Sequence, residues 1–265
     1  MSDVPAARHT LQVLDYLGRQ AAPVTAAAVV RDLGLPRSTV YHLLATLADH
    51  GYVTHLPEDR RWGLGLAAYE LGSGYSRQAP LQRAARAPLA ELVDRSGASA
   101  HLAVLAGAEV VYVIEDRAPG LPALVTDVGV RLPAQSTASG RALLASLPAA
   151  HVRALFPSAA AFTVRTDAGP RSPSALRARL IEARRLGYAT EDGEVTPGFG
   201  SVAAAVFDHA GHPVAAVAAT TVSERAADER LVHHVRRTAA GLSRRLGGSG
   251  RPAGRDGPAR SGAGG

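Results

Sequence analysis

Polar side chains recur along residues 37–46 on the side of a predicted helix that faces away from its apolar stripe. Guanidinium, hydroxyl and imidazole groups can hydrogen-bond to the edges of base pairs or to phosphates. Solvent-facing side chains of an ordinary surface helix would have the same composition, so the elements around them decide between the two interpretations. The candidate DNA contacts in this helix are Arg37, Ser38, Thr39, Tyr41, His42 and Thr46.

Two short helices joined by a tight turn are predicted over residues 23–51. Thr25 can cap the first helix, and Gly34 can adopt the left-handed conformation that ends it. Pro36 suits the first turn of the second helix, and Gly51 stops it. The apolar residues of the second helix recur at i, i+3, i+4 and i+7. They are Val40, Leu43, Leu44 and Leu47. This pattern is typical of a helix-turn-helix, although a helical hairpin inside a core would share it.

A strand, a turn and a second strand are predicted over residues 52–65, directly after these helices. Such a hairpin is the wing of a winged helix-turn-helix. Arg60 and Arg61 lie at its tip, where they could contact phosphates or enter a narrow minor groove. The alternative is two solvated charges on a surface hairpin.

A second group of candidate binding residues lies at the start of a helix predicted within residues 131–147. Ser136, Thr137 and Ser139 supply hydroxyl groups there. Unpaired N–H groups and a partial positive charge at a helix N-terminus favour a carboxylate or a similar anion. Hydroxyl residues at this position also serve as simple helix caps. Arg141, one turn further on, could pair with the anion or lie on the surface.

Catalytic and metal-binding motifs are missing from the sequence. The segment around Ser139 is not a G-x-S-x-G elbow, and no G-x-x-x-x-G-K loop is present. His233 and His234 are adjacent, which is not the i, i+4 spacing of a helical metal pair. Glu191 and Glu194 could form an acid/base pair, but carboxylates in loops are mostly solvated. We therefore expect no catalytic residue, no metal site and no cofactor, and we keep an enzyme as the less favoured class.

The composition is that of a globular protein of two domains. The chain has 265 residues, of which 46% are hydrophobic and 20% charged. It has no cysteine, which excludes disulfides and thiolate metal sites. It contains no run of 18 apolar residues, and its first residues lack the layout of a signal peptide. We expect a cytoplasmic protein without a membrane partner.

The net charge of +6 does not indicate DNA binding, because the surplus lies outside the predicted helix-turn-helix. Residues 1–79 contain seven arginines and seven acidic residues. Only the local placement of Arg37, Arg60 and Arg61 supports an interface with DNA.

Four segments follow from the order of the predicted elements. A helix over residues 8–18, with Leu11, Leu14 and Leu17 on its buried side, completes the first domain at residues 1–65. Residues 66–79 form a linker helix in which Gly72 and Gly74 could act as a hinge. Residues 80–247 form a second domain, and residues 248–265 are expected to be disordered.

The second domain is predicted to mix helices and strands. The expected helices cover residues 81–95, part of 131–147, 174–187 and a last helix capped by Ser223. The expected strands cover residues 100–105, 110–115, 124–128, 202–207 and 214–221, and residues 155–173 are expected to form a loop.

With these elements in this order, the chain resembles the IclR family of bacterial transcriptional regulators over roughly residues 8–247. Residues 35–53, LPRSTVYHLLATLADHGYV, look like the recognition helix of that family. Residues 128–145, VGVRLPAQSTASGRALLA, look like its G-x-x-x-P…T-A-x-G-[KR]-A-L-L-A signature. Residues 187–208, GYATEDGEVTPGFGSVAAAVFD, look like its GYA…E…PG…AA stretch.

The resemblance implies an α+β protein in which a winged helix-turn-helix is joined to a GAF-like effector domain. It also implies a homodimer or homotetramer that binds double-stranded operator DNA and a small-molecule effector, for example a carboxylate. The effector residues carried over are Ser136, Thr137, Ala138 and Gly140 at the helix start, Glu191 in a loop, Ser201 before a strand, and Ala218 and Thr220 in the last strand.

Four positions depart from the family pattern. The family usually has Asp, Cys and Ser where this chain has Glu191, Ser201 and Ala218, and Gln135 stands where His is common. The chemical class of the effector therefore cannot be carried over. A DNA-binding architectural protein whose second domain only oligomerises is the alternative, and the interior of that domain separates the two: a sensor needs a cavity with converging polar groups.

Overall fold

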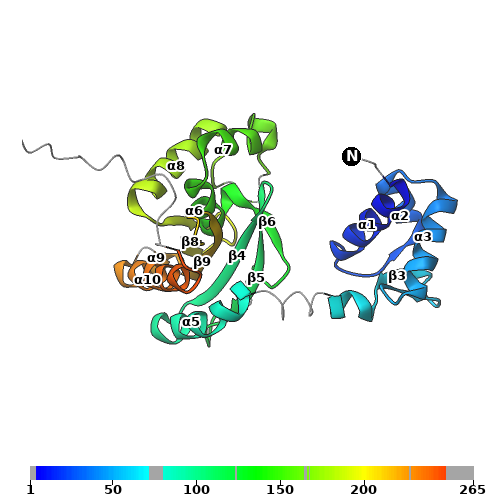
Figure 1. Ribbon diagram of the computed structural model, residues 1–265, viewed down its shortest axis with the longest axis horizontal. Coiled ribbons are helices and arrows are strands. Elements are labelled where there is room, and N and C mark those ends of the chain that lie inside the picture. The colour runs from blue at the N-terminus through cyan, green and yellow to red at the C-terminus, as the bar shows by residue number, and fades with distance from the viewer. Residues whose placement is uncertain are drawn as a thin grey trace, which may run out of the picture. The chain divides into compact units, whose positions relative to one another are not determined.

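The computed structural model describes residues 4–71, 80–122, 124–163, 166, 168–226 and 228–248. The chain divides into two compact units, residues 1–79 and 80–265 (Figure 1). Each unit has its own buried apolar core. The N-terminal helix-turn-helix and the mixed α/β unit that follows confirm the α+β architecture expected from the sequence.

Three helices and a small antiparallel sheet make up the N-terminal unit. The sheet has the strand order β1-β3-β2. Val53 of β2 pairs with Leu64 of β3, which forms the predicted wing. The elements are α1 (Pro5–Gly18), β1 (Val24–Thr25), α2 (Ala26–Leu33), α3 (Arg37–Asp49), β2 (Val53–Leu56) and β3 (Arg61–Leu64).

Local signals set the ends of α2 and the direction of α3. The Thr25 hydroxyl accepts a hydrogen bond from the Ala28 amide at 3.3 Å, as an N-cap does. Gly34 ends α2 with a φ of 64°, a conformation that costs glycine little. The chain therefore turns sharply into α3, whose apolar side packs against α1 and α2. The buried residues of α3 are Val40, Leu44 and Leu47.

The buried side of α1 differs from the prediction. Val13 and Leu17 are buried and Leu14 is half-buried, whereas Leu11 is 62% exposed. The inward stripe centres on Val13 and Leu17, which are four residues apart, and Leu11 lies well off that stripe at about 100° per residue. The prediction for Leu11 was wrong, because three leucines at a spacing of three drift around the helix.

The C-terminal unit is built on a six-stranded antiparallel sheet in the order β6-β5-β4-β9-β8-β7. Successive side chains of each strand point to opposite faces of the sheet, and both faces carry buried apolar residues. The strands are β4 (Ser99–Ala106), β5 (Glu109–Asp116), β6 (Arg131–Pro133), β7 (Ala189–Asp192), β8 (Phe199–Phe207) and β9 (Pro213–Val222).

Helices cover both faces of this sheet (Figure 1). On one face, α5 and α10 bury Leu89, Leu92, Val235 and Leu242 against the strands. On the other face, α6 and α8 bury Leu144, Leu176 and Leu180. The helices are α5 (Pro80–Ser96), α6 (Ala138–Ser146), α7 (Ala149–Leu155), α8 (Pro173–Leu186), α9 (Ser223–Ala226) and α10 (Glu229–Arg245), with short 3₁₀ turns at η1 (Ala134–Ser136) and η2 (Ala159–Ala161).

Several predicted elements of this unit need correction. The strand expected over residues 124–128 is irregular chain, and the strand β6 follows it at Arg131–Pro133. The polar stretch around Glu191 is strand β7 and not a loop, and Ser201 lies within β8 and not before it. The last helix is two helices, because Asp228 caps α10 by accepting a hydrogen bond from the Arg230 amide at 2.8 Å.

Part of the predicted linker lies outside the described residues. Residues 66–71 are helical, whereas the hinge glycines Gly72 and Gly74 and the tail from residue 249 onward are not described. None of the helices within the described ranges combines the length and the apolar character that crossing a bilayer requires.

Candidate functional site

The polar side of α3 faces solvent. Arg37, Ser38, Tyr41, His42 and Thr46 are exposed, and Thr39 is half-buried. The Arg37 guanidinium lies over the Tyr41 ring, 5.6 Å from its centre, so these two side chains hold each other in place by a cation–π contact. The Thr46 hydroxyl donates to the His42 carbonyl within the helix at 2.9 Å. The N-terminal half of α3 thus exposes polar side chains, Ser38 and His42 among them, to solvent, as a surface that reads bases requires.

The two arginines of the wing differ in what fixes them. The side chain of Arg61 is held by a hydrogen bond, whereas Arg60 has an unusual backbone conformation. Arg61 donates to the Pro23 carbonyl oxygen at 2.8 Å, which links the wing to the segment before α2. Arg60 is exposed and has a φ of 51°, an uncommon value for a residue other than glycine. Trp62 and His55 stack across the two strands with ring centres 4.3 Å apart, which stiffens the hairpin.

The effector candidates of the second unit meet on the sheet face beneath α6. The strand register places Thr220, Ser201 and Glu191 in one row across β9, β8 and β7. On the same face of the sheet, two residues further along each of these three strands, the next row consists of alanines alone. They are Ala218, Ala203 and Ala189. Because alanine side chains are short, the second row leaves a hollow beside the first.

The polar row is internally hydrogen-bonded. The Ser201 hydroxyl donates to Glu191 Oε1 at 2.6 Å, and the Ser201 and Thr220 oxygens are 2.9 Å apart. Since a hydroxyl has one proton, Thr220 is then the donor to Ser201. Burial raises the pKa of Glu191 to about 7, even though the Ser201 hydrogen bond opposes the shift. Glu191 therefore changes charge near neutral pH.

The start of α6 closes the hollow from above. Thr137 is its N-cap and accepts from the Gly140 amide at 2.9 Å. Ser136 lies one residue earlier, in η1, and is not part of the lining. Gly140 is also outside the lining: a side chain there would overlap the Ala134 backbone, so glycine is needed for α6 to approach η1.

Arg141 is neither an anion ligand nor a surface residue. Its guanidinium is buried, forms an ion pair with Glu194, and donates to the carbonyls of Gln135 and Thr190 at 2.8 Å each. All sides of the guanidinium are thus engaged by protein groups. The Arg141–Glu194 pair holds the start of α6 against the segment that follows β7.

Six of the eight predicted effector residues line the resulting cavity, and Ser136 and Gly140 do not. The cavity has a volume of about 10 Å³, enough for a water molecule and too small for an organic molecule. Sequence reasoning missed several lining residues. They are His101, Tyr112, Leu124, Thr126, Val195, Thr196 and Phe199. The available signal was His101, a histidine among the apolar residues of a predicted strand, but the strand pattern alone does not say into which site its side chain points.

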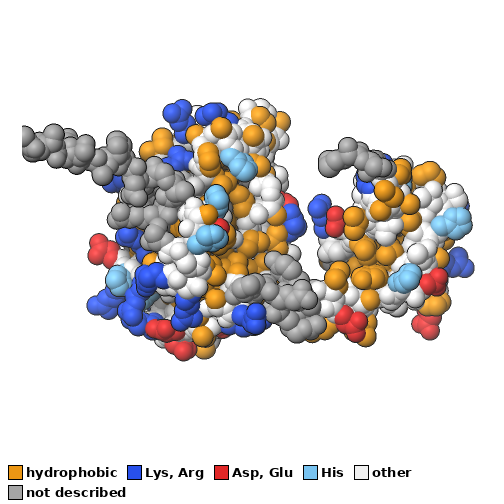
Figure 2. Space-filling model, in the orientation of Figure 1, with side chains coloured by type: hydrophobic (Ala, Val, Ile, Leu, Met, Phe, Trp, Pro, Cys, Tyr) orange, Lys and Arg blue, Asp and Glu red, His pale blue; other side chains and the backbone are white. Residues whose placement is uncertain are grey.

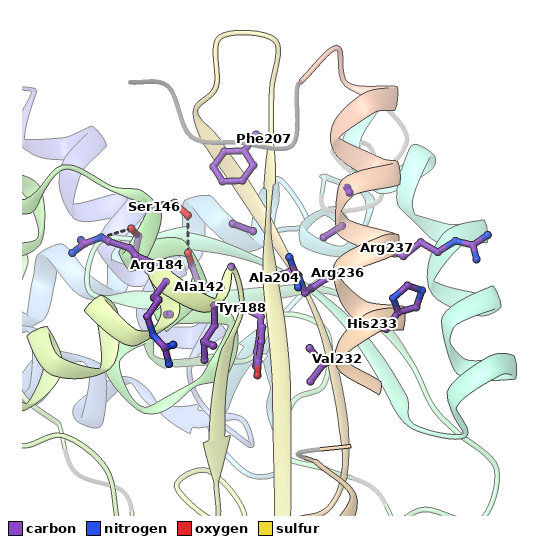
Figure 3. A pocket seen from close by; sticks show the side chains of 18 of the residues that line it. Ala142, Ser146, Arg184, Tyr188, Ala204, Phe207, Val232, His233, Arg236 and Arg237 are labelled. Atoms are coloured by element: carbon purple, nitrogen blue, oxygen red, sulfur yellow. Dashed lines mark hydrogen bonds between the residues drawn. The ribbon is translucent and has the colours of Figure 1, made fainter. Parts of the chain in front are cut away.

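A larger hollow of about 770 Å³ lies at the outer edge of the sheet. It exists because the pairing of β7 with β8 ends at Ala203, which leaves the last residues of β8 without an outer strand in the described structure. Figure 3 shows β8 between Arg184 of α8 on one side and Arg236 and Arg237 of α10 on the other. Arginines also gather over α5 and α10 in Figure 2. None of the predicted effector residues lines this groove.

Comparison with known proteins identifies both units. The profile of the bacterial transcriptional regulator IclR C-terminal domain matches residues 74–244. The profile of the IclR helix-turn-helix domain matches residues 6–57. The chain is 31% identical to the HTH-type transcriptional regulator XynR of Escherichia coli, over 93% of this chain and 99% of XynR.

Solved structures share the fold over nearly the whole chain. An IclR transcriptional regulator from a Silicibacter species is 25% identical, with a TM-score of 0.82 over 94% of this chain and 98% of that one. An IclR homologue from Microbacterium hydrocarbonoxydans, solved with 4-hydroxybenzoate, is 24% identical with a TM-score of 0.77, over 91% of this chain and 98% of that one. The chain belongs to the IclR family of transcriptional regulators, with an N-terminal helix-turn-helix and a C-terminal effector-binding domain.

Proposed function

We propose that this regulator binds a palindromic operator as a homodimer or homotetramer and that a small organic effector in the second unit modulates the binding. The observation that carries the proposal is the division of α3 into two sides. Val40, Leu44 and Leu47 are buried, while the polar residues from Arg37 to Thr46 that could read bases are exposed. A helix buried in a core would not leave such groups in water.

On DNA, α3 enters the major groove with Arg37, Ser38, Tyr41 and His42 toward the base edges. The two-fold partner reads a second half-site about 34 Å along the duplex. The wing contacts the phosphate backbone, with Arg60 as the main contact because the Arg61 side chain is held by the Pro23 carbonyl.

The effector acts at the cavity under α6. A ligand changes DNA affinity only by binding one arrangement of the protein more tightly than another. Since the cavity of about 10 Å³ has no room for an organic molecule, ligand binding has to move part of its lining. Such a movement gives the ligand the required preference for one arrangement.

Sequencing the DNA fragments that the purified full-length protein retains tests the first part of the proposal. We expect an inverted repeat whose half-sites are about one helical turn apart, with affinity falling steeply as salt rises. An Arg37→Ala and His42→Ala double variant should lose the preference for that repeat and keep much of the non-specific binding. Retention of the preference by this variant would exclude α3 as the reading element.

An architectural DNA-binding protein without an effector is the second candidate, and the small volume of the cavity favours it. A thermal-shift screen with organic acids, sugars and amino acids separates the two functions. A compound that stabilises the protein and changes its operator affinity supports the regulator. If no compound in such a screen does either, the architectural function gains.

A further inference from the structure

The outer edge of β8 is paired at its two ends and open between them. β7 pairs with it as far as Ala203. At the other end, the Phe207 amide donates to the Ser243 hydroxyl of α10 at 3.0 Å. No strand within the described ranges lies beside residues 204–206 on this side. An open edge of this kind can pair with the backbone of another chain.

Ala205 is the residue whose backbone faces the opening. Alternate residues of an antiparallel strand hydrogen-bond to opposite neighbours. On the outer side of β8 the series begins at Phe199, whose carbonyl accepts from the Gly193 amide at 2.8 Å, and it continues through Ala203 to Ala205. In the part of the chain that the structure describes, no group is hydrogen-bonded to Ala205 on this side. Its N–H and C=O are therefore available to an additional strand.

The opening forms the floor of the groove of about 770 Å³. Helices α8 and α10 lie on opposite faces of the sheet, so they form the two walls of the groove (Figure 3). Seven of the lining residues are alanines, from α6, α8, β8 and α10. Because these side chains are short, they leave room beside β8, where a further strand would lie about 4.8 Å away. The open residues 204–206 span about 10 Å at about 3.3 Å per residue, so three or four residues of an extended chain fit there.

The walls of the groove are positively charged. Four arginines line it against one acidic residue. They are Arg184 and Arg185 of α8 and Arg236 and Arg237 of α10, and the acidic residue is Glu229. In Figure 3, Arg236 points toward β8, whereas Arg237 points away from it. Electrostatic complementarity therefore favours an acidic occupant.

The C-terminal tail of this chain does not have the charge that the groove requires. The chain leaves α10 beside the opening, where Gly247 forms an antiparallel bridge with Asp208. The sequence that follows, residues 249–265, contains three arginines and a single acidic residue, Asp256. It also contains two prolines, which lack the N–H that strand pairing uses. Charge and composition thus favour a segment of a different protein.

We propose that the groove binds an extended acidic segment of another protein, which adds a strand to the outer edge of β8. The backbone of the segment hydrogen-bonds to Ala205, and its carboxylates contact Arg185 and Arg236. Successive side chains of a strand point to opposite faces, so neighbouring acidic residues reach different walls. This partner is additional to DNA and to the effector, because none of the predicted effector residues lines the groove.

Fluorescence anisotropy with the full-length protein at about 0.15 M salt tests the chemistry of the partner. The labelled probe is a short peptide in which pairs of acidic residues alternate with pairs of valines. One control peptide has glutamine and asparagine in place of the acids, and a second keeps the charges but is N-methylated at alternate backbone positions. We expect the acidic probe to bind at least about 10-fold more tightly than either control, because one control loses charge and the other loses strand pairing.

Two double variants test the role of the walls. Arg185→Gln with Arg236→Gln removes one lining arginine from each wall and should weaken binding of the acidic probe by about 5- to 10-fold. Arg177→Gln with Arg230→Gln removes one exposed arginine from each of the same helices outside the lining. Since the loss of charge is equal, this control should change the affinity by less than about twofold.

Ala205→Pro tests strand pairing within the protein. Proline removes the N–H that faces the opening, and it is tolerated at a strand edge because this N–H takes no part in the pairing with β9. The variant should no longer bind the acidic peptide, whereas it should bind heparin, a polyanion without a peptide backbone, as the wild type does. Circular dichroism verifies the fold, and the N-methylated peptide tests the same pairing on the unaltered protein.

Several results would overturn the inference. Equal binding of the acidic and N-methylated peptides, or equal effects of the two double variants, would leave only a charged surface. No binding of the acidic probe at millimolar concentration would exclude an acidic partner, and binding that appears only when the chain is shortened to end at Gly248 would make the tail the occupant. If the probe splits the protein into smaller oligomers in sedimentation velocity, the groove is an interface between copies of this chain.

Discussion

The outer side of α3 and the cavity under α6 are both polar, but their polar groups stand in opposite environments. Ser38, Tyr41 and His42 are exposed to solvent, whereas His101 and Ser139 are each 1% exposed and have no partner of normal geometry among the described residues. Exchanging water for a base edge on α3 changes the free energy only modestly. A ligand that supplies a hydrogen-bonding partner to the unpaired atoms of the cavity removes a free-energy cost that these atoms already carry. A close match of shape and hydrogen bonding is therefore more strongly rewarded in the cavity.

The basic groove at the edge of the sheet sharpens this comparison, because it is far larger than the cavity. Its volume is about 770 Å³ against about 10 Å³. Yet Arg185, Arg236 and Arg237 along it are exposed, so solvent can satisfy their N–H groups. Volume alone would select the groove as the ligand site. The presence of unpaired buried polar atoms instead indicates the cavity as the ligand site.

Replacing Gly140 by alanine should have the largest effect on the cavity side. A side chain at Gly140 would overlap the backbone of Ala134, so α6 has to move away from η1. We expect the second unit to lose more than about 3 kcal/mol of unfolding free energy. Circular dichroism during urea unfolding measures this loss, while the fluorescence of Trp62, the only tryptophan, follows the N-terminal unit and should not change.

The matched control for this change is Gly241→Ala. Gly241 also lies in a helix, α10, but a side chain there meets only the far end of Arg244 at 3.8 Å. Alanine should leave stability equal or raise it by up to about 1 kcal/mol. Equal losses in the two variants would mean that the approach of α6 to η1 is not the cause.

Replacing Glu191 by glutamine should change how stability depends on pH. The folded protein holds the Glu191 proton up to about pH 7, against an ordinary value of 4.5. Between these values the folded state binds the proton and the unfolded state does not, so wild-type stability falls as pH rises. The fall is at most about 3 kcal/mol. The glutamine variant should not show it.

Urea unfolding at pH 5, 6, 7 and 8 measures the difference between the two proteins. Burial lowers the pKa of His101 to about 4, and this shift acts in the opposite sense, since it removes stability as pH falls from 6.5 toward 4. This contribution is common to both proteins and cancels in the difference. A difference that stays constant across the pH range would show that Glu191 is ionised throughout, contrary to its burial.

Substitutions on the exposed side of α3 should change the affinity for the operator and leave the stability of the fold unchanged. His42→Ala removes a donor and acceptor that faces solvent, so the fold should be unaffected. Discrimination should fall by about 1–3 kcal/mol at one or two base pairs of the operator. Asp49→Ala, at the far end of α3, is the control and should leave every position unchanged. Uniform weakening at all base pairs by His42→Ala would place His42 on the phosphates.

The same contrast explains what could be predicted from the sequence. The α3 surface depends on residues within a few turns of one another, so the spacing of Val40, Leu44 and Leu47 was enough to place its polar side. The cavity depends on strand register. His101 meets Ala218, and Glu191 meets Ser201, through pairings between distant segments. Periodicity within one strand contains no information about such pairings.

The errors around the cavity have the same origin. Glu191 was predicted in a loop because Ala189–Asp192 is short and polar, yet pairing with β8 makes it a strand. Arg141 was expected at an anion or at the surface, and it is buried because Glu194, far along the chain, neutralises it. Each residue is polar, and a partner outside its local segment determines its environment.

Replacing Arg60 by glycine should have the smallest effect, and it separates charge from conformation in the wing. Arg60 has a φ of 51°, which glycine adopts more easily, so the change removes a charge and relieves strain at once. Stability should hold or rise, while the slope of log affinity against log salt becomes shallower by about one unit.

Arg61→Ala should also release the Pro23 carbonyl, so it combines a structural loss with a lost charge. Anisotropy titrations with operator and with unrelated DNA should weaken in parallel for Arg60→Gly. Loss on the operator alone would mean that Arg60 reads sequence, and an unchanged slope would remove it from the phosphate contacts.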